Sequence, residues 1–441
     1  MKMTLALFQY DRIMPLAAGY LAIGLEQHEI EYRTVFINVD EFIRTGRDIN
    51  GLVSQLTDEN EILAIGCYSD MLPFAILAVR IIKHYSPEKV IVLGGIGPGI
   101  VAEEIIKSFD FIDFVISGCG IEGLPKLIKL IGRKGDKYSN IIGLYYRKMG
   151  AVIRPKDILS WYTPRQPSYR TEGKARLAEL FLVKTSSGCP YACTFCYGST
   201  FLGGRSVEKR KLIDVIAEIK FISLLKGRES FRISFIDEAF ITDKKRIIEF
   251  CRLLIENEVH VSWMCYGRVG CTDANMLALM NEAGCNEIYY GVESGSNRIL
   301  GLIKKGFTKE EALRALIEAY RIIPRVTASF IYRYPFESLR EFIDTYAFLQ
   351  LLRSKGIRTQ LHPLMPLKGS SMYRQYYRQL RFSNSEPSSY IGNGDAISTL
   401  PEECISIINS HPRVFYDYGF YHSEGQEKIL EFIKEHRIAL S

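Results

Sequence analysis

Short apolar runs alternate with amphipathic stretches along the first 132 residues. The apolar runs have the length of buried strands and lie at 4–8, 32–36, 62–67, 89–93 and 114–117. The stretches between them repeat their apolar positions at helical spacing and lie at 15–26, 40–56, 73–84 and 100–109. Alternation of strand and helix at this spacing predicts a doubly wound, Rossmann-like parallel sheet.

The same alternation returns over 181–370. Strands are expected at 182–185, 232–236, 261–266, 287–291, 327–332 and 358–361. Helices are expected at 211–225, 244–257, 273–283, 309–321 and 339–354. Six strand–helix units predict a partial (β/α)6 barrel of the TIM type, and the whole chain is therefore expected to be an α/β protein.

These patterns divide the chain into four parts. Residues 1–132 form the first domain, 133–180 a linker with a small hairpin, 181–370 the barrel, and 371–441 a small, mainly helical region that closes with a helix at 424–436. The segment 133–176 holds eleven Lys and Arg against three acidic residues, so its charge is +8 while the rest of the chain carries −2 of the net +6. It is either a solvated connector or a basic wall that faces an acidic ligand, such as a phosphate-bearing cofactor or a peptide.

Composition excludes several classes of protein. With 47% hydrophobic and 24% charged residues, the chain is neither disordered nor a coiled coil. No apolar run reaches about 18 residues and the first residues turn polar too soon for a signal peptide, so a cytoplasmic location without membrane contact is expected. Ten cysteines in 441 residues are too few for a disulfide scaffold, and clustered cysteines in a reducing compartment indicate metal or redox chemistry.

Three consecutive strand ends of the first domain carry glycine-rich loops. These loops are 66–70, 94–99 and 118–123. The carboxyl ends of parallel strands meet at one edge, where doubly wound sheets bind ligands, and glycines allow close approach of backbone. No GxGxxG follows the first strand, so the pattern is not the dinucleotide fingerprint.

Three cysteines follow the first barrel strand as Cys189-Pro-Tyr-Ala-Cys193-Thr-Phe-Cys196. Three thiolates within eight residues converge on one metal centre when the segment forms a loop. Structural zinc would need a fourth ligand, whereas a four-iron, four-sulfur cluster held by three cysteines leaves one iron open for a substrate or cofactor.

The cysteine run resembles the CxxxCxΦC loop of the radical S-adenosylmethionine (radical SAM) superfamily, with Phe195 as Φ. Segments over about 180–375 extend the resemblance: the acidic strand end 235–240, the W…R segment 263–268, the AGC…GxESGS segment 283–296, Lys305-Gly306 and the P-x-x-P-x-x-G-[ST] segment 363–370. The first domain resembles the cobalamin-binding domain often fused ahead of this barrel, through 92–95 and 118–122. Together they suggest a cobalamin-dependent radical SAM enzyme.

The resemblance implies a role for each matching residue. The cluster ligands would be Cys189, Cys193 and Cys196. The SAM-binding residues would be Phe195, Asp237, Glu238, Arg268, Glu293 and Ser294, with the two acids at the ammonium and Arg268 at the carboxylate. The cobalamin-binding residues would be Cys67, Tyr68, Ser69, Gly94, Gly95, Ile96, Gly97, Gly118, Gly120 and Glu122. His362, at the sixth barrel strand, is the candidate for a catalytic acid, base or substrate ligand.

The sequence also departs from the family pattern. The common D-x-H-x-x-G, which supplies a lower axial histidine to cobalt, is absent, and His28 is read as a surface or core residue. Absence of that histidine is typical of the cobalamin-dependent radical SAM group, but it leaves open that cobalamin is not bound. At the fifth barrel strand, Arg333 and Phe336 stand where the usual G-x-P-G-E turn has glycines, which suggests a reshaped pocket.

The resulting hypothesis is an enzyme that generates a 5′-deoxyadenosyl radical and methylates an unactivated carbon, or a phosphinate, of a small-molecule or peptide natural product. It would use a 4Fe-4S cluster, SAM and methylcobalamin, with electrons from a flavodoxin or ferredoxin, and no nucleic-acid partner is expected. A radical rearrangement or cyclisation with the same cofactors is the alternative. A methylthiotransferase would need three more cluster cysteines in the first domain, where only Cys67 and Cys119 occur. A cobalamin-binding sensor or chaperone would not need the cysteine run.

Overall fold

The chain forms two compact units in the computed structural model. The first comprises residues 1–178 and 398–416, and the second comprises 179–397 and 417–441. The structure describes residues 2–9, 13–14, 16–38, 49–133, 138–158, 167–168, 178–196, 198, 206–227, 229–384 and 400–438. The region 371–441, expected as one piece, is thus divided between the two units.

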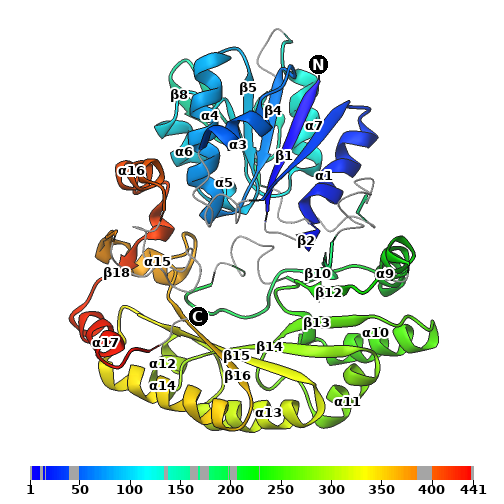
Figure 1. The fold of residues 1–441 in the computed structure, drawn as a ribbon, viewed down its shortest axis with the longest axis vertical. Helices are drawn as coiled ribbons and strands as arrows, with labels where there is room; N and C mark the ends of the chain where they lie inside the picture. Colours follow the sequence, from blue (N-terminus) through cyan, green and yellow to red (C-terminus); the bar gives the residue numbers. More distant parts are fainter. Residues whose placement is uncertain are drawn as a thin grey trace. The chain divides into compact units, whose positions relative to one another are not determined.

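The first unit contains a seven-stranded sheet in the order β3-β1-β4-β5-β6-β7-β8 (Figure 1). Its strands are β1 (Met3–Gln9), β3 (Tyr32–Asn38), β4 (Ile62–Gly66), β5 (Val90–Gly94), β6 (Phe114–Ile116), β7 (Leu144–Lys148) and β8 (Ala151–Ile153). The five strands from β1 to β6 are parallel, as expected for a Rossmann-like sheet, whereas β7 and β8 pair antiparallel. The expected hairpin therefore extends this sheet. A two-residue strand, β2 (Ile13–Met14), follows β1.

Helices connect the parallel strands. They are α1 (Leu16–Gln27), α3 (Ile49–Leu56), α4 (Leu72–Tyr85), α5 (Ile96–Ile100), α6 (Ala102–Ser108) and α7 (Gly120–Leu130). The expected helix 100–109 corresponds to α6, and the short helix α5 before it lies largely in the expected loop 94–99. The 40–48 part of the expected helix 40–56 lies outside the described residues. A later helix, α16 (Glu402–Ser410), packs on α4 of this unit although more than 300 residues separate them.

The central strands of the first unit's sheet, β1, β4 and β5, are buried on both faces. Every residue of β1 is buried, and β4 and β5 expose only their ends. Leu5, Ala64 and Val92 of three neighbouring strands join Leu124 and Leu127 of α7 in one apolar cluster. Burial of both faces explains why these strands are continuous apolar runs rather than alternating ones.

The second unit contains six parallel strands in the order β16-β15-β14-β13-β12-β9. They are β9 (Leu180–Val183), β12 (Arg232–Phe235), β13 (Ser262–Gly267), β14 (Cys285–Glu293), β15 (Arg325–Tyr332) and β16 (Arg358–Pro363). Each follows its predecessor along the chain and pairs with it, which is the arrangement of a partial (β/α)6 barrel. The α/β class expected from the sequence is confirmed.

The barrel helices alternate with these strands. They are α9 (Leu212–Lys226), α10 (Lys244–Glu256), α11 (Ala274–Glu282), α12 (Asn297–Leu302), α13 (Lys309–Ile322) and α14 (Leu339–Ser354). Figure 1 shows α10, α11, α13 and α14 along one face of the sheet. Thr308 and Ser338 begin α13 and α14 with capping boxes to Glu311 and Glu341, so these boundaries follow from local sequence.

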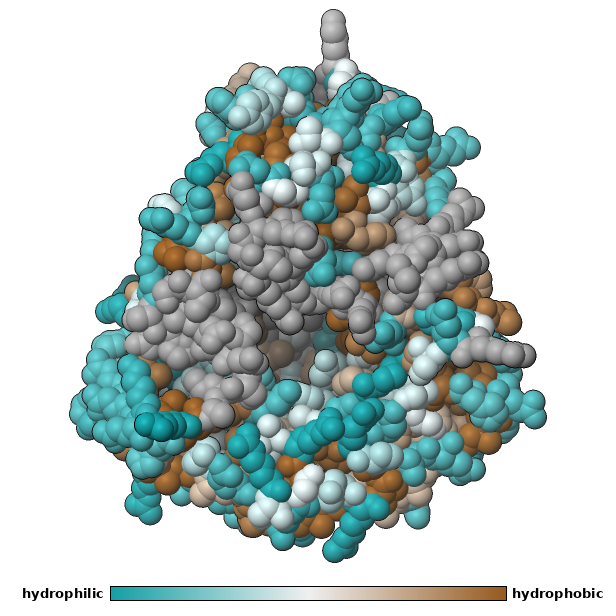
Figure 2. Space-filling view, viewed as in Figure 1, coloured by the Kyte–Doolittle hydropathy of each residue, from teal (hydrophilic) through white to brown (hydrophobic). Residues whose placement is uncertain are grey.

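Shorter elements complete the second unit. They are β10 (Ser186–Ser187), β11 (Glu208–Lys209), α15 (Ser371–Tyr376), β17 (Leu380–Arg381), β18 (Phe420–Tyr421) and α17 (Glu424–Glu435). Figure 2 shows hydrophilic residues over much of the visible surface, with hydrophobic residues scattered among them. Among the described residues, no helix is both long and apolar enough to cross a membrane.

Candidate functional site

The cysteine loop leaves the carboxyl end of β9. Cys189, Cys193 and Cys196 are partly buried, carry free thiols and influence one another electrostatically. The Gly198 amide donates to Cys196 Sγ at 3.2 Å, and a guanidinium nitrogen of Arg268 lies 3.8 Å from Cys193 Sγ. Burial raises the pKa of Cys189 and Cys196, whereas the Gly198 amide beside Cys196 and the Arg268 guanidinium oppose this rise and favour the thiolate form that an iron–sulfur cluster requires.

No three Cys, His, Asp or Glu side chains of the described residues lie close enough together to hold a single metal ion. A four-iron cluster attaches each thiolate to a different iron, so its ligands are spread around a larger body. Three neighbouring thiols on one loop fit that group, and a closed zinc site with four converging ligands is not formed by the described residues.

Arg268 follows β13 and joins the cysteine loop to the segment after α12. Its guanidinium stacks on the Tyr191 ring, 3.6 Å from the ring centre, and donates to the Lys305 carbonyl oxygen. Tyr191 in turn contacts the Cys271 sulfur at 3.4 Å, and burial raises the pKa of its hydroxyl to about 12. The guanidinium is therefore held in one position beside the expected cluster.

Glu293 ends β14 and forms a buried ion pair with Lys305, whose Nζ lies 3.2 Å from Oε1. Its φ of 75° is in the left-handed region, where a non-glycine residue is strained. The carboxylate folds back over Gly291, where an added Cβ would lie 2.4 Å from Oε1. Strained backbone with a buried charge at a strand end is typical of functional sites.

Ser294, the next residue, has a different environment. Its side chain is fully buried, contacts the Thr345 hydroxyl at 3.0 Å and accepts from the Ser296 amide. These bonds fix the turn between β14 and α12, so Ser294 supports the position of Glu293.

Asp237 and Glu238 follow β12 and also differ from each other. Asp237 is fully buried and accepts three hydrogen bonds, from the amide and hydroxyl of Thr185 and from the Ser186 hydroxyl. Burial raises its pKa, and these donors oppose the rise. Glu238 pairs with Lys184 at 2.7 Å and accepts from the Gly188 amide.

The side chains around Arg268 and Glu293 form one group at the carboxyl edge of the barrel sheet. Those around Asp237 and Glu238 form a second group there, and both groups contact the cysteine loop or the segment that leads into it. Phe195 packs partly buried against Tyr334, with the Lys305 ammonium 5.9 Å from its ring centre. Sequence reasoning missed Lys184 and Tyr191 and did not assign Lys305 a site role. The position of Lys184 at a strand end and the Lys305-Gly306 motif were the available signals.

His362 lies on β16, half-buried, with Nε2 3.4 Å from Gln360 Oε1. The same oxygen accepts a hydrogen bond from Tyr289 at 2.6 Å. The expected catalytic candidate is therefore part of a polar group on the barrel wall, whose other members the sequence reasoning missed.

The three glycine loops of the first unit lie at the carboxyl edge of its sheet, as expected. At Gly95 and Gly97 an added Cβ would lie 2.7 Å or less from the backbone of Cys67, Tyr68 or Ser69, so these glycines pack one loop against the next. Gly94, Gly118, Gly120 and Ile96 lie at the ends of β5 and β6 and the starts of α5 and α7, and Gly118 has a φ of 80°. Glu122 is about half exposed and pairs with Lys126 on α7.

Buried amides lie at the same edge. Gln9 ends β1 with 3% of its surface exposed, and neither polar atom of its side chain has a hydrogen-bond partner among the described residues. Asn38 ends the neighbouring β3, and its side-chain Oδ1 is also buried without a hydrogen-bond partner among the described residues. Since β1 lies where the strand order reverses, Gln9 is at the switch point where doubly wound sheets bind ligands.

The surroundings of His28 and Cys119 do not indicate that either residue is a cobalt ligand. His28 follows the last turn of α1, which runs back from the carboxyl edge, and Cys119 packs buried with Tyr20 and Ile121. The position of His28 agrees with the structural role expected for it.

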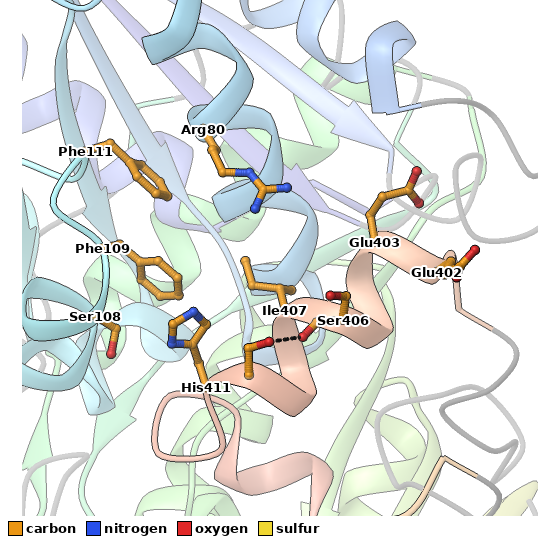
Figure 3. Close-up of a pocket in the computed structure, with 10 residues that line it drawn as sticks. Arg80, Ser108, Phe109, Phe111, Glu402, Glu403, Ser406, Ile407 and His411 are labelled. Carbon is orange, nitrogen blue, oxygen red and sulfur yellow. Dashed lines mark hydrogen bonds between the residues drawn. The ribbon is translucent and has the colours of Figure 1, made fainter.

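A cavity of about 440 Å³ in the first unit lies away from this edge (Figure 3). Arg80, Phe109 and His411 line it, and the last two rings meet edge to face at 4.5 Å. Arg80 is near the end of α4, and Phe109 follows the end of α6. Because these helices run back from the carboxyl edge, the cavity is not the expected cofactor site.

Comparison with known proteins agrees with the geometry. Residues 183–349 match the model of the radical SAM superfamily. An uncharacterized methyltransferase of Pyrococcus horikoshii is 28% identical over 77% of this chain and 73% of its own length. A tRNA-2-methylthio-N(6)-dimethylallyladenosine synthase of Carboxydothermus hydrogenoformans is 24% identical over 62% of this chain and 59% of its own length.

Two solved structures share the fold over nearly the whole chain. The cobalamin-dependent S-adenosylmethionine radical enzyme OxsB, with aqua-cobalamin and S-adenosylmethionine bound, is 17% identical, with a TM-score of 0.68 over 99% of this chain and 75% of its own. The radical S-adenosylmethionine methyltransferase TsrM of Kitasatospora setae, with tryptophan substrate and a SAM analogue bound, is 15% identical, with a TM-score of 0.70 over 98% of this chain and 88% of its own. At these identities the likeness concerns the fold.

Proposed function

Because this chain carries a radical SAM domain within the fold of cobalamin-dependent radical SAM enzymes, we propose that it is a cobalamin-dependent methyltransferase. Its substrate is a small molecule or a peptide natural product with an unactivated carbon, or a phosphinate, as the methyl acceptor. It acts in the cytoplasm with a flavodoxin or ferredoxin as electron donor. The match to a named methyltransferase over 73% of that protein's length supports the reaction class.

In this proposal, residues of the barrel form the SAM-binding site. Cys189, Cys193 and Cys196 hold the cluster. Arg268, fixed by Tyr191 and the Lys305 carbonyl, receives the SAM carboxylate through a charge-assisted pair. Glu238, whose carboxylate accepts from the Gly188 amide of the cysteine loop, receives the ammonium.

The unpartnered Gln9 amide at the switch point is the observation that carries the cobalamin assignment. A buried carboxamide without partners costs free energy, and a bound ligand with amide groups of its own would satisfy both of its atoms. Methylcobalamin supplies the methyl group when bound. Gln9, with the loops after β4, β5 and β6, binds and orients it at this edge.

The related tRNA-methylthio synthase raises methylthio transfer as another reaction. That reading needs three further cluster cysteines in the first domain, and the sequence before residue 178 has only Cys67 and Cys119. Both are buried on separate loops, and burial raises the pKa of Cys67 far above its ordinary range. Methyl transfer is therefore the better reading.

The reconstituted enzyme, incubated with methyl-deuterated SAM, a reductant and a cell extract of candidate acceptors, tests the proposal by mass spectrometry. A product heavier by the labelled methyl group supports methylation. Formation of 5′-deoxyadenosine with an unlabelled, altered product would instead establish rearrangement or cyclisation. An unchanged absorption spectrum after addition of hydroxocobalamin would refute the cobalamin assignment.

Cys193→Ala tests the cluster assignment, with Cys271→Ala as its matched control. Cys271 contacts Tyr191 near the cysteine loop but is not one of the three expected ligands. We expect Cys193→Ala to abolish 5′-deoxyadenosine formation and to lower bound iron, while Cys271→Ala retains both. Iron content and chromatography of SAM products measure the difference, and SAM cleavage retained by Cys193→Ala would contradict the assignment.

A further inference from the structure

The cavity of the first unit (Figure 3) is bounded by three elements that lie far apart in the sequence. Arg80 on α4 lines one part of it, Phe109 and Phe111 after α6 line another, and α16 contributes side chains from Glu402 to His411. All of the lining residues belong to the first unit. The volume of about 440 Å³ falls in the range of about 300–1,000 Å³ that small-molecule sites occupy. The first unit by itself therefore forms a site large enough for a small ligand.

Aromatic rings form one end of this cavity. The His411 ring meets the Phe109 ring edge to face at 4.5 Å, and the centre of the Phe111 ring lies 5.6 Å from that of Phe109. Phe109 is buried, whereas Phe111 and His411 keep part of their surface exposed. Burial lowers the pKa of His411 below its ordinary value of 6.5, so the ring carries no charge at neutral pH. This end is therefore an uncharged aromatic surface, against which a flat ring of a ligand can pack.

Arg80 supplies a positive charge to the cavity. It is exposed near the end of α4, and its guanidinium makes no hydrogen bond or ion pair with any residue that the structure describes. The neighbouring cations are already engaged, because Lys83 pairs with Asp113 at 3.1 Å and Arg147 donates to main-chain carbonyls at the end of α6. Arg80 is therefore the cation through which this cavity can bind an anionic group.

Two carboxylates lie beyond Arg80, away from the rings. Glu402 and Glu403 are in the first turn of α16, both are exposed, and neither forms an ion pair within the described part of the chain. With a rise of about 1.5 Å per residue, the eight positions from Glu403 to His411 separate the acids from the aromatic end by about 12 Å along the helix. Figure 3 shows the same order, with the rings on one side of Arg80 and the glutamates on the other. Rings, cation and acids therefore follow one another along the cavity.

The charges of the lining residues restrict what this cavity can bind. An aromatic carboxylate could pair with Arg80, but its charge would also meet the repulsion of the two glutamates. An aromatic amine could pair with the glutamates and would leave Arg80 without a partner. A ligand with a ring, a carboxylate and an ammonium group satisfies all three parts of the cavity. The remaining lining side chains are uncharged and do not alter this balance: Ser108, Ser406, Ile407 and Ser410.

We propose that this cavity binds a free aromatic α-amino acid. The carboxylate pairs with Arg80, the ammonium group pairs with Glu402 or Glu403, and the ring packs against Phe111 and His411. Because the ligand contacts both α4 and α16, its binding stabilises the packing of α16 on the first unit. The cavity lies away from the carboxyl edge of the sheet, so this inference does not rest on the proposed function.

L-phenylalanine, phenethylamine and 3-phenylpropanoate test the two charge contacts, since they share the phenyl ring and differ in the amine and the carboxylate. Isothermal titration calorimetry on the full-length protein measures their dissociation constants. We expect each of the two analogues to bind at least about tenfold more weakly than L-phenylalanine, because each loses one charge-assisted pair. The proposal is overturned if either analogue binds as tightly as L-phenylalanine, or if L-phenylalanine, L-tyrosine and L-tryptophan all fail to bind.

Arg80→Gln locates the carboxylate contact, and Arg133→Gln, on an exposed arginine that does not line the cavity, is its control. We expect Arg80→Gln to weaken L-phenylalanine binding about tenfold and to leave phenethylamine binding unchanged, because phenethylamine has no carboxylate. The double variant Glu402→Gln with Glu403→Gln should weaken L-phenylalanine binding and should not weaken that of 3-phenylpropanoate. Unchanged L-phenylalanine binding in Arg80→Gln or in the double variant would refute the assigned contacts.

Hydrogen exchange followed by mass spectrometry locates the bound amino acid without any variant. L-phenylalanine should slow exchange in α4 and α16 and leave exchange in β14 and β15 unchanged. Slower exchange in the barrel strands alone would place the amino acid in the second unit and refute the cavity as its site. SAM cleavage and the hydroxocobalamin spectrum test the proposed function through other residues, so the two proposals can fail independently.

Discussion

At the scale of single residues, the two adjacent acids after β12 have separate duties. Asp237 binds three donors of the segment that leads into the cysteine loop, and all of these groups are buried. Glu238 keeps more of its surface and pairs with Lys184. One acid therefore fixes the path of the chain, and the other faces the proposed SAM site.

Replacement of each acid should separate these duties. Asp237→Ala leaves three buried donors unpaired and is expected to lower the free energy of unfolding by about 2–4 kcal/mol. Glu238→Gln should weaken SAM binding about tenfold, because a charge next to the ammonium is lost. It should lower stability by less than Asp237→Ala does, because the glutamine oxygen can still accept from Lys184 and the Gly188 amide. Urea unfolding and SAM titration measure the two effects. The assignment fails if Glu238→Gln is the less stable variant and Asp237→Ala the weaker SAM binder.

Glu337 gives the chain a pH-dependent stability. It is buried in the turn after β15, where Oε2 accepts from the amides of Arg333 and Tyr334. Burial raises its pKa from 4.5 to about 8. The folded state thus holds a proton that the unfolded state releases above pH 4.5, so the contribution of Glu337 to stability is greatest below that value and declines as the pH rises toward 8.

Glu337→Gln keeps the acceptor oxygen and removes the titration. Between about pH 5 and 8, the unmodified protein should lose up to about 1.4 kcal/mol of stability per pH unit relative to the variant. Urea unfolding at several pH values measures the gap. If the stability difference stays constant across this range, Glu337 is not protonated in the folded protein.

At the scale of elements, the loops of the first unit depend on the absence of side chains. An added Cβ at Gly97 would lie 2.6 Å from backbone atoms of Tyr68 and Ser69, whereas one at Gly94 would lie 3.8 Å from the Ile116 oxygen. The first distance forces backbone to move, and the second is an ordinary contact. The loops after β4 and β5 therefore keep their shape only with glycine at 97.

Gly97→Ala should displace the loop after β4 and weaken cobalamin binding by at least about tenfold, while the control Gly301→Ala, on α12 of the other unit with no atom within 4 Å of the added Cβ, binds as the unmodified chain does. Titration with hydroxocobalamin, followed by visible absorption, gives the affinities. Circular dichroism checks that both variants fold. Equal affinities in the two variants would show that this loop packing does not shape the site.

Element types followed from the sequence wherever the periodic pattern was long. The barrel strands and the helices α10, α11, α13 and α14 lie within a few residues of their expected positions. The six-residue helices α12 and α15 were not expected, because they are too short to show a periodic pattern. The division of α5 from α6 depends on loop packing at Gly97 and Gly99, which no local pattern reveals.

The candidate site was predictable to the extent that motifs mark its residues. The cysteine loop, Arg268 and Glu293 follow from the family resemblance. The pairing of Glu293 with Lys305, the burial of Ser294 and the orientation of Gln360 by Tyr289 arise only when separate elements meet. Tertiary contacts between positions far apart in the sequence carry no local signal.

At the scale of the whole molecule, α16 belongs to the first unit although it follows the barrel in the sequence. Ile407 and Ile408 of α16 are buried, and His411 meets Phe109 after α6. Figure 3 shows this helix beside the Arg80, Phe109 and His411 side chains. The first unit is therefore complete only when residues 398–416 are in place.

Ile407→Ala should lower the stability of the first unit and leave that of the second unit unchanged. Truncation of a buried isoleucine is expected to lower its stability by about 2–5 kcal/mol, and the exposed Ser406→Ala on the same helix serves as the control. Hydrogen exchange followed by mass spectrometry should show faster exchange in α4 and α6 and unchanged exchange in β14 and β15. Equal acceleration in the barrel strands would show that the two units do not respond separately.

The return of the chain to its first unit has a consequence during translation. Residues 1–178 leave the ribosome first, but the helix that completes their fold is made only after 219 further residues. At bacterial or eukaryotic elongation rates this delay is roughly 10–45 s. Over that interval the face of α4 that later receives α16 stays uncovered in the nascent chain. A chaperone that binds apolar segments during synthesis is therefore expected to bind this protein at α4.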